Sequence, residues 1–178
     1  MRPLLYEFTA TVFSFGRRKA AYDRLAELCE AETGEKVLDV GCGTGYLTRR
    51  LKAAVGPGGA VTGVDPSRPM LEYAVRHVPT CYFQEASAQA LPFAEGSFDL
   101  VASSLAIHHV PPGQQPEAFR ELRRVLRPGG RVVIMELHGS SHGHAVDDLP
   151  GQLEAAGFTV TDDAPIQRRL RCVRAQAV

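Results

Sequence analysis

The sequence lacks a charge excess and a long apolar run, and each absence excludes a class of protein. Its 20 Lys and Arg residues balance its 20 Asp and Glu residues, so no electrostatic attraction points to nucleic acid as a partner. No apolar run approaches the roughly 20 residues that a membrane-spanning helix needs. We therefore expect no nucleic-acid partner and no integral membrane association.

Paired cysteines are missing as well. The chain has four cysteines and no C-x-x-C pair among them: Cys29, Cys42, Cys81 and Cys172. This pattern fits neither a zinc site nor a disulfide framework, so reduced thiols in the cytoplasm are its simplest interpretation. The N-terminus does not read as a signal peptide, because Glu7 interrupts its apolar residues and the basic residues follow them. We expect a cytoplasmic protein.

Two segments rich in basic residues are interpreted without a ligand. The segment HGSSHGH, 138–144, has three histidines but no accompanying set of carboxylates, so we read it as a polar loop and assign no metal site. The segment RRLRCVR, 168–174, is interpreted as the solvated face of an edge strand, where charges deter edge-to-edge pairing.

The chain has the length of one domain. With 178 residues it can bury one sizeable core but not two. We expect a single domain, 1–178, with an N-terminal helical segment at 1–34 and an α/β core at 35–178. The assembly is expected to be a monomer or a homodimer.

Short apolar segments alternate with segments of helical period, which predicts a doubly wound α/β fold with a mainly parallel sheet. The last strand is expected to be half-buried, as an edge or antiparallel strand is. Strands are predicted at 36–41, 60–65, 81–86, 98–104, 131–137, 158–163 and 167–174, and helices at 18–31, 44–54, 67–77, 115–127 and 148–158, the last ending at Gly157.

A glycine-rich loop, VLDVGCGTGYLT at 37–48, follows the first core strand. Gly41, Gly43 and Gly45 stand between a strand and a helix, where glycine lets a nucleotide approach the backbone closely. The dinucleotide fingerprint requires a further glycine where this chain has Tyr46. The loop therefore favours a nucleotide-like ligand other than NAD.

Two carboxylates narrow the range of ligands that the loop could bind. Asp39 lies two residues before the first glycine, where it would repel a pyrophosphate and attract an ammonium or sulfonium. Asp65 ends the second strand, a position suited to both ribose hydroxyls. An adenosyl group with a positive charge nearby, as in S-adenosylmethionine, fits this pair.

Four segments in correct order resemble the motifs of class I S-adenosylmethionine-dependent methyltransferases. They are VLDVGCGTGYLT, VTGVDPSRPML, ASAQALPFAEGSFDLV and FRELRRVLRPGGRVVIMEL, and together they cover roughly residues 35–137. The branch that they most resemble contains the ubiquinone/menaquinone-biosynthesis and small-molecule methyltransferases. The resemblance implies a Rossmann-like, seven-stranded sheet with helices on both faces and an antiparallel last strand.

The resemblance also implies a set of cofactor-binding residues. The glycine loop, with Cys42 inside it, would pack against the methionine moiety, with Asp39 near its amino group and Asp65 on the ribose. The family usually has an acidic residue at the adenine amine, and here that position is Ser87. The remaining cofactor-binding candidates are Pro66, Met70 and Ala88 at the adenine, Ser103 with Ser104 beside it at the methionine end, and Tyr6 on the N-terminal segment. That segment would act as a lid over the cofactor, pack on the sheet, or do both.

The chemistry implied is methyl transfer, for which the cofactor supplies the activated methyl group and S-adenosylhomocysteine is the product. A base is needed only where the acceptor must lose a proton. His108 and His109 follow the fourth strand and are the candidates; the alternative is that they only pack in the pocket.

The acceptor is expected to be a small molecule methylated on O, N or C. The Asn/Asp-Pro-Pro-aromatic sequence of nucleobase and glutamine amino-methyltransferases is absent after the fourth strand, as is a Pro-Cys nucleophile. A second hypothesis keeps the fold and changes the role, to a binding or regulatory module or a cofactor-dependent cyclase. It is motivated by Ser87 and by the lack of an inserted cap domain.

Overall fold

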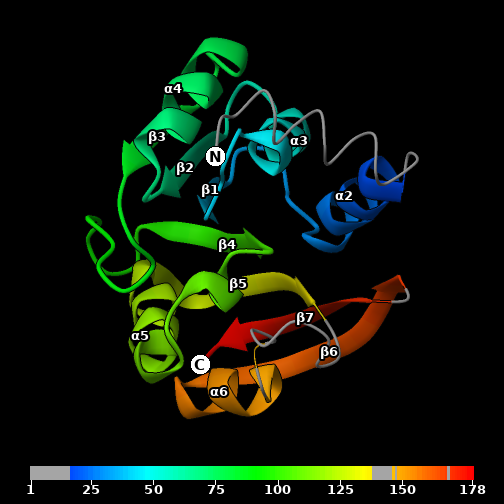
Figure 1. Ribbon diagram of the computed structural model, residues 1–178, viewed down its shortest axis with the longest axis vertical. Coiled ribbons are helices and arrows are strands. Elements are labelled where there is room, and N and C mark those ends of the chain that lie inside the picture. Colours follow the sequence, from blue (N-terminus) through cyan, green and yellow to red (C-terminus); the bar gives the residue numbers. More distant parts are fainter. Residues whose placement is uncertain (1–16, 138–145, 147, 168) are drawn as a thin grey trace.

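The computed structural model describes residues 17–137, 146, 148–167 and 169–178. Across these residues, seven strands form one sheet in the order β3-β2-β1-β4-β5-β7-β6 (Figure 1). The strands are β1 (Lys36–Val40), β2 (Ala60–Asp65), β3 (Tyr82–Glu85), β4 (Phe98–Ser104), β5 (Leu126–Leu137), β6 (Phe158–Gln167) and β7 (Leu170–Ala177), and the α-helices are α2 (Arg17–Leu28), α3 (Tyr46–Val55), α4 (Arg68–His77), α5 (Gln115–Val125) and α6 (Leu149–Ala155).

The sheet has the predicted direction of strands. β1 pairs in parallel with β2 and β4, β2 with β3, and β4 with β5. β7 runs antiparallel to both β5 and β6. The predicted doubly wound α/β fold with an antiparallel last strand is therefore confirmed.

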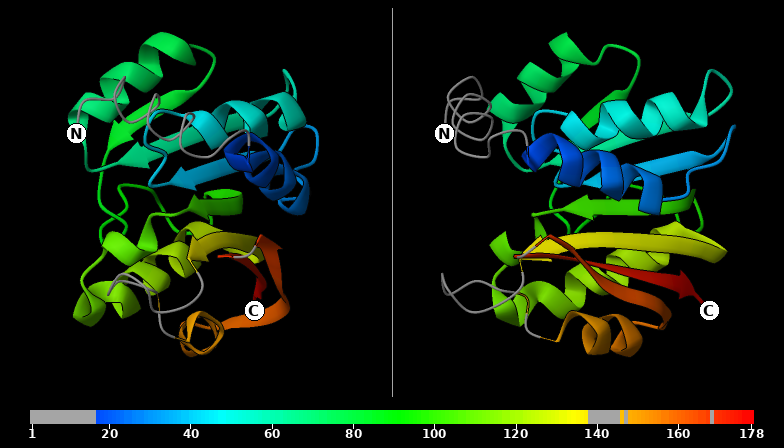
Figure 2. Two further views of the ribbon diagram at one scale, coloured as in Figure 1. Left: turned by 45° about the vertical axis from the view of Figure 1, so that its right-hand side comes forward. Right: turned by 90° about the vertical axis from the view of Figure 1, so that its right-hand side faces the viewer.

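The core lies in two layers, one on each side of the sheet. On one side Tyr22 and Leu25 of α2 and Leu47 and Leu51 of α3 pack against the sheet. On the other side α5 and α6 cover it, with Phe119 fully buried. Figure 2 shows these helices on opposite faces. Burial on both faces explains why β1 and β4 read as near-continuous apolar runs.

The place of β7 corrects one prediction. The strand is antiparallel as expected, but it lies between β5 and β6, so it is not an edge strand. The arginines of this strand form ion pairs and do not protect a sheet edge from pairing. Arg171 pairs with Asp163, and Arg174 pairs with Glu30 and Asp162. The acidic partners stand on neighbouring elements, which a reading of the strand alone does not reveal.

Several boundaries also differ from the predictions. β5 begins at Leu126, which pairs with Phe98 ahead of a register shift, so helix α5 ends at Val125. The predicted stop RPGG lies inside this strand. β6 extends to Gln167, and α6 is confined to Leu149–Ala155. None of these changes moves the carboxyl ends of the central strands.

Some expectations concern residues outside the described part of the chain. Tyr6 and the rest of the proposed lid at 1–16 belong to it, as do the histidines of the segment 138–144. Among the helices that are described, none combines the length and the apolar character needed to cross a membrane.

Candidate active site

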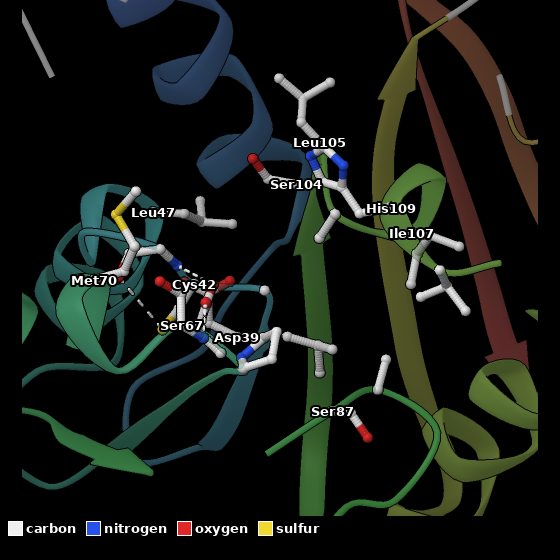
Figure 3. Close-up of a pocket in the computed structure, with 18 of the residues that line it drawn as sticks. Asp39, Cys42, Leu47, Ser67, Met70, Ser87, Ser104, Leu105, Ile107 and His109 are labelled. Atoms are coloured by element: carbon white, nitrogen blue, oxygen red, sulfur yellow. Dashed lines mark hydrogen bonds between the residues drawn. The ribbon is translucent and has the colours of Figure 1, made fainter. Parts of the chain in front are cut away.

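A cavity of about 490 Å³ opens beyond the carboxyl ends of β1, β2 and β4 (Figure 3). In open α/β sheets this is where ligands bind. Most of the candidates from the sequence line it: Asp39, Gly41, Cys42, Gly43, Asp65, Pro66, Met70, Ser87, Ala88 and His109. Gly45, Ser103 and His108 are not among the lining residues.

The first two glycines of the loop have different tasks. Gly41 has a φ of +73°, and a Cβ there would lie 2.1 Å from Cβ of Ala106. Glycine at this position therefore lets the loop pass close to the segment after β4. Gly43 has a φ of +53°, and a Cβ there would meet no atom within 4 Å. At Gly43 bare backbone faces the cavity, so a ligand can approach it closely.

Gly45 supports the loop without facing the cavity. It precedes α3 with a φ of +78°, and a Cβ there would press on Val78 and Phe83 at 3.2 and 3.3 Å. The close approach brings α3 against α4 and β3. Gly45 therefore contributes to the site through the packing of α3 and not through contact with a ligand.

Asp65 fastens the glycine loop to the end of β2. Its Oδ2 accepts a hydrogen bond of 2.9 Å from the backbone N–H of Gly43, and its Oδ1 accepts one of 2.8 Å from that of Ser67. Because each carboxylate oxygen has a second lone pair, Asp65 can also accept hydrogen bonds from a ligand. Asp65 thus lines the cavity with acceptor capacity to spare.

Asp39 is a buried carboxyl at the cavity wall. It is only 1% exposed and accepts a hydrogen bond of 2.6 Å from Oγ1 of Thr48. Burial raises its pKa to about 7, with a further increase from the negative charge of Asp65, while the Thr48 hydrogen bond acts in the opposite direction. A carboxylate in such a place is stabilised by a bound cation.

Two segments that follow β2 and β3 also line the cavity. Pro66 and Met70 come after β2, and Ser87 and Ala88 come after β3. Ser87 is held in a turn by pairing with Ala90. A neutral serine thus stands where the resembled family carries an acid.

The two adjacent serines at the end of β4 point to different surroundings. Oγ of Ser103 donates a 2.9 Å hydrogen bond to the carbonyl of Val40 and is fully buried. Ser104, which lines the cavity, is 8% exposed, and its Oγ has no partner among the described residues. The sequence interpretation placed both serines near the cofactor, whereas the structure brings only Ser104 to the cavity wall.

The rings of the two histidines lie side by side, with 4.1 Å between centroids, but their surroundings differ. His109 lines the cavity, whereas Nδ1 of His108 lies 2.7 Å from Oε2 of Glu136, which is 1% exposed. The other oxygen of Glu136 accepts from the backbone N–H groups of Ala106 and Ile107, at 3.0 and 2.8 Å. Glu136 thus anchors the segment that carries both histidines.

Sequence reasoning missed Glu136 and also missed Tyr22 on α2. The Tyr22 side chain lines the cavity, and its ring meets that of Tyr46 edge-on with 5.0 Å between centroids. The Arg50 guanidinium lies 4.1 Å from the Tyr46 ring centroid and pairs with Asp23 at 2.8 Å. Aromatic and ionic contacts therefore hold α2 at the cavity.

Cys42 is a packing residue of the loop wall. It is 7% exposed, and burial raises the pKa of its thiol well above its usual range, so it stays a thiol. A thiol that is not ionised is a poor nucleophile. Cys42 is also packed tightly, since a Cβ on Gly63 would lie 2.8 Å from its Sγ.

These residues fit an adenosyl cofactor that carries a positive charge. Gly43 offers open backbone, Asp65 offers acceptors, and buried Asp39 offers negative charge once it is ionised.

Comparison with known proteins agrees with this geometry. Residues 37–130, just over half of the chain, match the family model described as a methyltransferase domain. The chain is 37% identical over 134 residues to a demethylmenaquinone methyltransferase of Staphylococcus aureus, a match that covers 74% of this chain and 55% of the relative. The chain thus spans about half the length of the curated relatives it matches.

Solved structures show the same fold. A SAM-dependent methyltransferase from Aquifex aeolicus is 21% identical with a TM-score of 0.76, and the match covers 88% of this chain and 89% of that one. The cyclase SpnF is 20% identical with a TM-score of 0.75, covering 88% and 79%. This chain therefore belongs to the methyltransferase domain family, in the class I group whose cofactor is S-adenosylmethionine.

Proposed function

We propose that this chain transfers a methyl group from S-adenosylmethionine to a small, largely apolar acceptor. The observation that carries the proposal is a single cavity that joins the glycine loop and Asp65 to an apolar wall after β4. Leu105, Ile107 and Val110 form that wall. A cavity of about 490 Å³ is in the usual range for small-molecule sites, roughly 300–1,000 Å³.

One end of the cavity is proposed to bind the cofactor and the other end the acceptor. Asp65 and the backbone of Gly43 hold the adenosyl part, while Asp39 opposes the positive charge of the amino-acid part. When bound, the cofactor supplies a methyl group on a cationic sulfur, ready for in-line displacement. The protein then has to orient the acceptor and exclude water.

Some acceptors, such as a phenol, must lose a proton when they are methylated. For these acceptors we propose that His109 accepts the proton. His109 lines the cavity, whereas Nδ1 of His108 is engaged by Glu136. For an acceptor without such a proton, His109 contributes only to the wall. We therefore expect the His109→Gln variant to lose rate on a phenolic acceptor and to keep S-adenosylhomocysteine affinity.

The acceptor class is proposed from the relative and from the lining. The S. aureus relative is named for demethylmenaquinone, a quinone, and an apolar wall beside a histidine suits a reduced quinone or a phenol. We further propose a cytoplasmic protein without a nucleic-acid partner, acting as a monomer or homodimer. The balanced charge of the chain supports the exclusion of nucleic acid.

The experiment is an assay for S-adenosylhomocysteine and methylated product with a panel of phenols, naphthols and reduced quinones. Product formation that depends on Asp65 supports the proposal. The similarity in fold to the cyclase SpnF defines the competing outcome. If the protein binds the cofactor but forms no S-adenosylhomocysteine with any acceptor, a binding module or a cyclase replaces the transferase.

A further inference from the structure

The hydroxyl of Ser104 stands out among the polar groups of the cavity. The residue is more than nine-tenths buried and lines the cavity, and its Oγ has no hydrogen-bond partner in the described part of the chain. A buried hydroxyl without a partner destabilises a protein. Such a group is retained at a cost, which a ligand that bonds to it would offset.

The alternation of β4 explains why the adjacent serines differ. Side chains along a strand point alternately to the two faces of the sheet. Ser104 shares a face with Leu100 and Ala102, which pack in the core layer of α2 and α3. Ser103 faces the other layer and is satisfied by the carbonyl of Val40. Ser104 therefore lies on the α2 side of the sheet, with its buried hydroxyl at the cavity wall.

The surroundings of Ser104 indicate which ligand it would meet. Figure 3 shows Ser104, Leu105 and His109 toward one end of the view, with Ser67 and Met70 toward the other. Ser67 donates a hydrogen bond to Asp65, so the adenosyl contact proposed for Asp65 lies toward the second end. Ser104 is therefore a polar residue in an otherwise apolar part of the cavity wall, close to the residues proposed to contact the acceptor.

We propose that Ser104 is a specificity-determining residue, whose hydroxyl forms a hydrogen bond with an oxygen of the methyl acceptor. The acceptor class is then an apolar ring or chain that carries a hydroxyl or carbonyl oxygen. The inference deepens the proposed function and rests on it. An apolar analogue without that oxygen leaves Ser104 unpaired and binds more weakly.

The first test uses the ligand-free protein and the two serines as matched variants. Ser104→Ala removes a hydroxyl that has no partner, and we expect a melting temperature that is unchanged or raised by about 2–4 °C. Ser103→Ala removes a buried hydrogen bond, and we expect a decrease of similar size. A clear decrease for Ser104→Ala would contradict the inference, because it would mean that the hydroxyl is already satisfied.

The second test measures ligand binding by NMR titration of protein saturated with S-adenosylhomocysteine. The probes are 1-naphthol and naphthalene, which differ only in the hydroxyl oxygen. We expect the wild type to bind 1-naphthol about tenfold more tightly than naphthalene, a preference of one hydrogen bond in a buried site. In Ser104→Ala this preference should vanish, with naphthalene affinity retained, whereas Ser103→Ala should keep it.

The outcomes separate this inference from the proposed function. If the wild type does not bind S-adenosylhomocysteine, the proposed function fails. If it binds S-adenosylhomocysteine but shows no preference for 1-naphthol, or the same preference in Ser104→Ala, the inference about Ser104 fails alone. A loss of S-adenosylhomocysteine affinity of more than tenfold in Ser104→Ala would assign the hydroxyl to the cofactor and would also overturn it.

Discussion

Oε2 of Glu136 lies 2.7 Å from Nδ1 of His108, and this contact joins the end of β5 to the segment after β4. The other carboxylate oxygen takes the backbone N–H groups of Ala106 and Ile107. The segment begins at Leu105, whose φ of +53° is unusual for a leucine. Such a conformation persists only where its surroundings hold it, and Glu136 supplies a large part of that hold.

Replacing Glu136 with alanine should therefore destabilise the fold. The change leaves the N–H groups of Ala106 and Ile107 without their acceptor, at a cost of about 1–3 kcal/mol for each buried group. We expect the free energy of unfolding, measured in urea, to fall by about 2–5 kcal/mol. Glu154→Ala, on the exposed side of α6, is the control and should have almost no effect. Equal stability of the two variants would contradict the role of Glu136 in holding the segment after β4.

The more conservative Glu136→Gln variant should stay folded and report on His108. A carboxylate at 2.7 Å requires a proton on Nδ1 of His108, whereas an amide N–H turned toward the ring favours the other tautomer. We expect the ¹⁵N shifts of the ring to reverse their assignment and methyl transfer to fall by about tenfold or more. S-adenosylhomocysteine affinity should be retained. An unchanged tautomer would contradict the assigned contact.

The ionisation of Asp39 should make cofactor affinity depend on pH. Because burial raises its pKa to about 7, the ligand-free site is mostly protonated at pH 6 and mostly ionised at pH 8. A cationic cofactor binds the ionised form better, so its affinity should increase by up to about tenfold over that interval. Calorimetric titrations with S-adenosylmethionine across this range test the prediction.

Two variants check that Asp39 is the group responsible. Asp39→Asn should abolish the pH dependence, and Thr48→Val should move its midpoint upward, because the Thr48 hydrogen bond lowers the pKa of Asp39. The raised pKa also means that the folded state holds its proton longer than the unfolded state. Asp39 therefore costs stability as pH rises from about 4 to about 7, and Asp39→Asn should relieve that cost at pH 8. A pH dependence that survives in Asp39→Asn would assign it elsewhere.

Asp65 should be far more important for binding than a comparable carboxylate at the other end of the sheet. Asp65→Ala frees the Gly43 and Ser67 N–H groups and removes the proposed ribose contact. We expect S-adenosylhomocysteine affinity to fall by about 100-fold or more. Asp99, near the start of β4, also accepts a backbone N–H, that of Lys36. Asp99→Ala should lower stability and leave affinity within about twofold.

The open backbone at Gly43 should tolerate no side chain when a ligand is bound. Gly43→Ala adds a methyl group to the cavity wall at a positive φ, so we expect both a stability loss of about 1–2 kcal/mol and a large loss of S-adenosylhomocysteine affinity. Gly34→Ala is the matched control, since Gly34 also has a positive φ and open space but lies before β1. It should lose stability alone. Equal affinities in the two variants would mean that the ligand does not approach Gly43.

Much of the fold could be predicted because its signals are local. The apolar runs of β1 and β4 and the helical period of α5 mark buried elements, and their alternation predicts a parallel sheet. The position of β7 inside the sheet could not be predicted in this way. It depends on pairing with both β5 and β6 and on acidic partners that are distant in sequence, such as Glu30 for Arg174.

Residues of the candidate site could be predicted where a characteristic residue type occurs at the end of a predicted strand. Asp65 and the glycines have such signals, and the structure places Asp65, Gly41 and Gly43 at the cavity. Glu136 has a weaker signal, an acidic residue inside the apolar run RVVIMEL. The choice between Ser103 and Ser104 required the phase of β4, and the choice between His108 and His109 required the partner of His108.

The most direct test of the central claim is a calorimetric titration of the purified protein with S-adenosylhomocysteine. We predict saturable binding with one site per chain and loss of that binding in Asp65→Ala, with Asp99→Ala binding as the wild type does. Absence of binding in a folded wild-type protein, or binding that Asp65→Ala leaves unchanged, would contradict the assignment of this cavity to the cofactor.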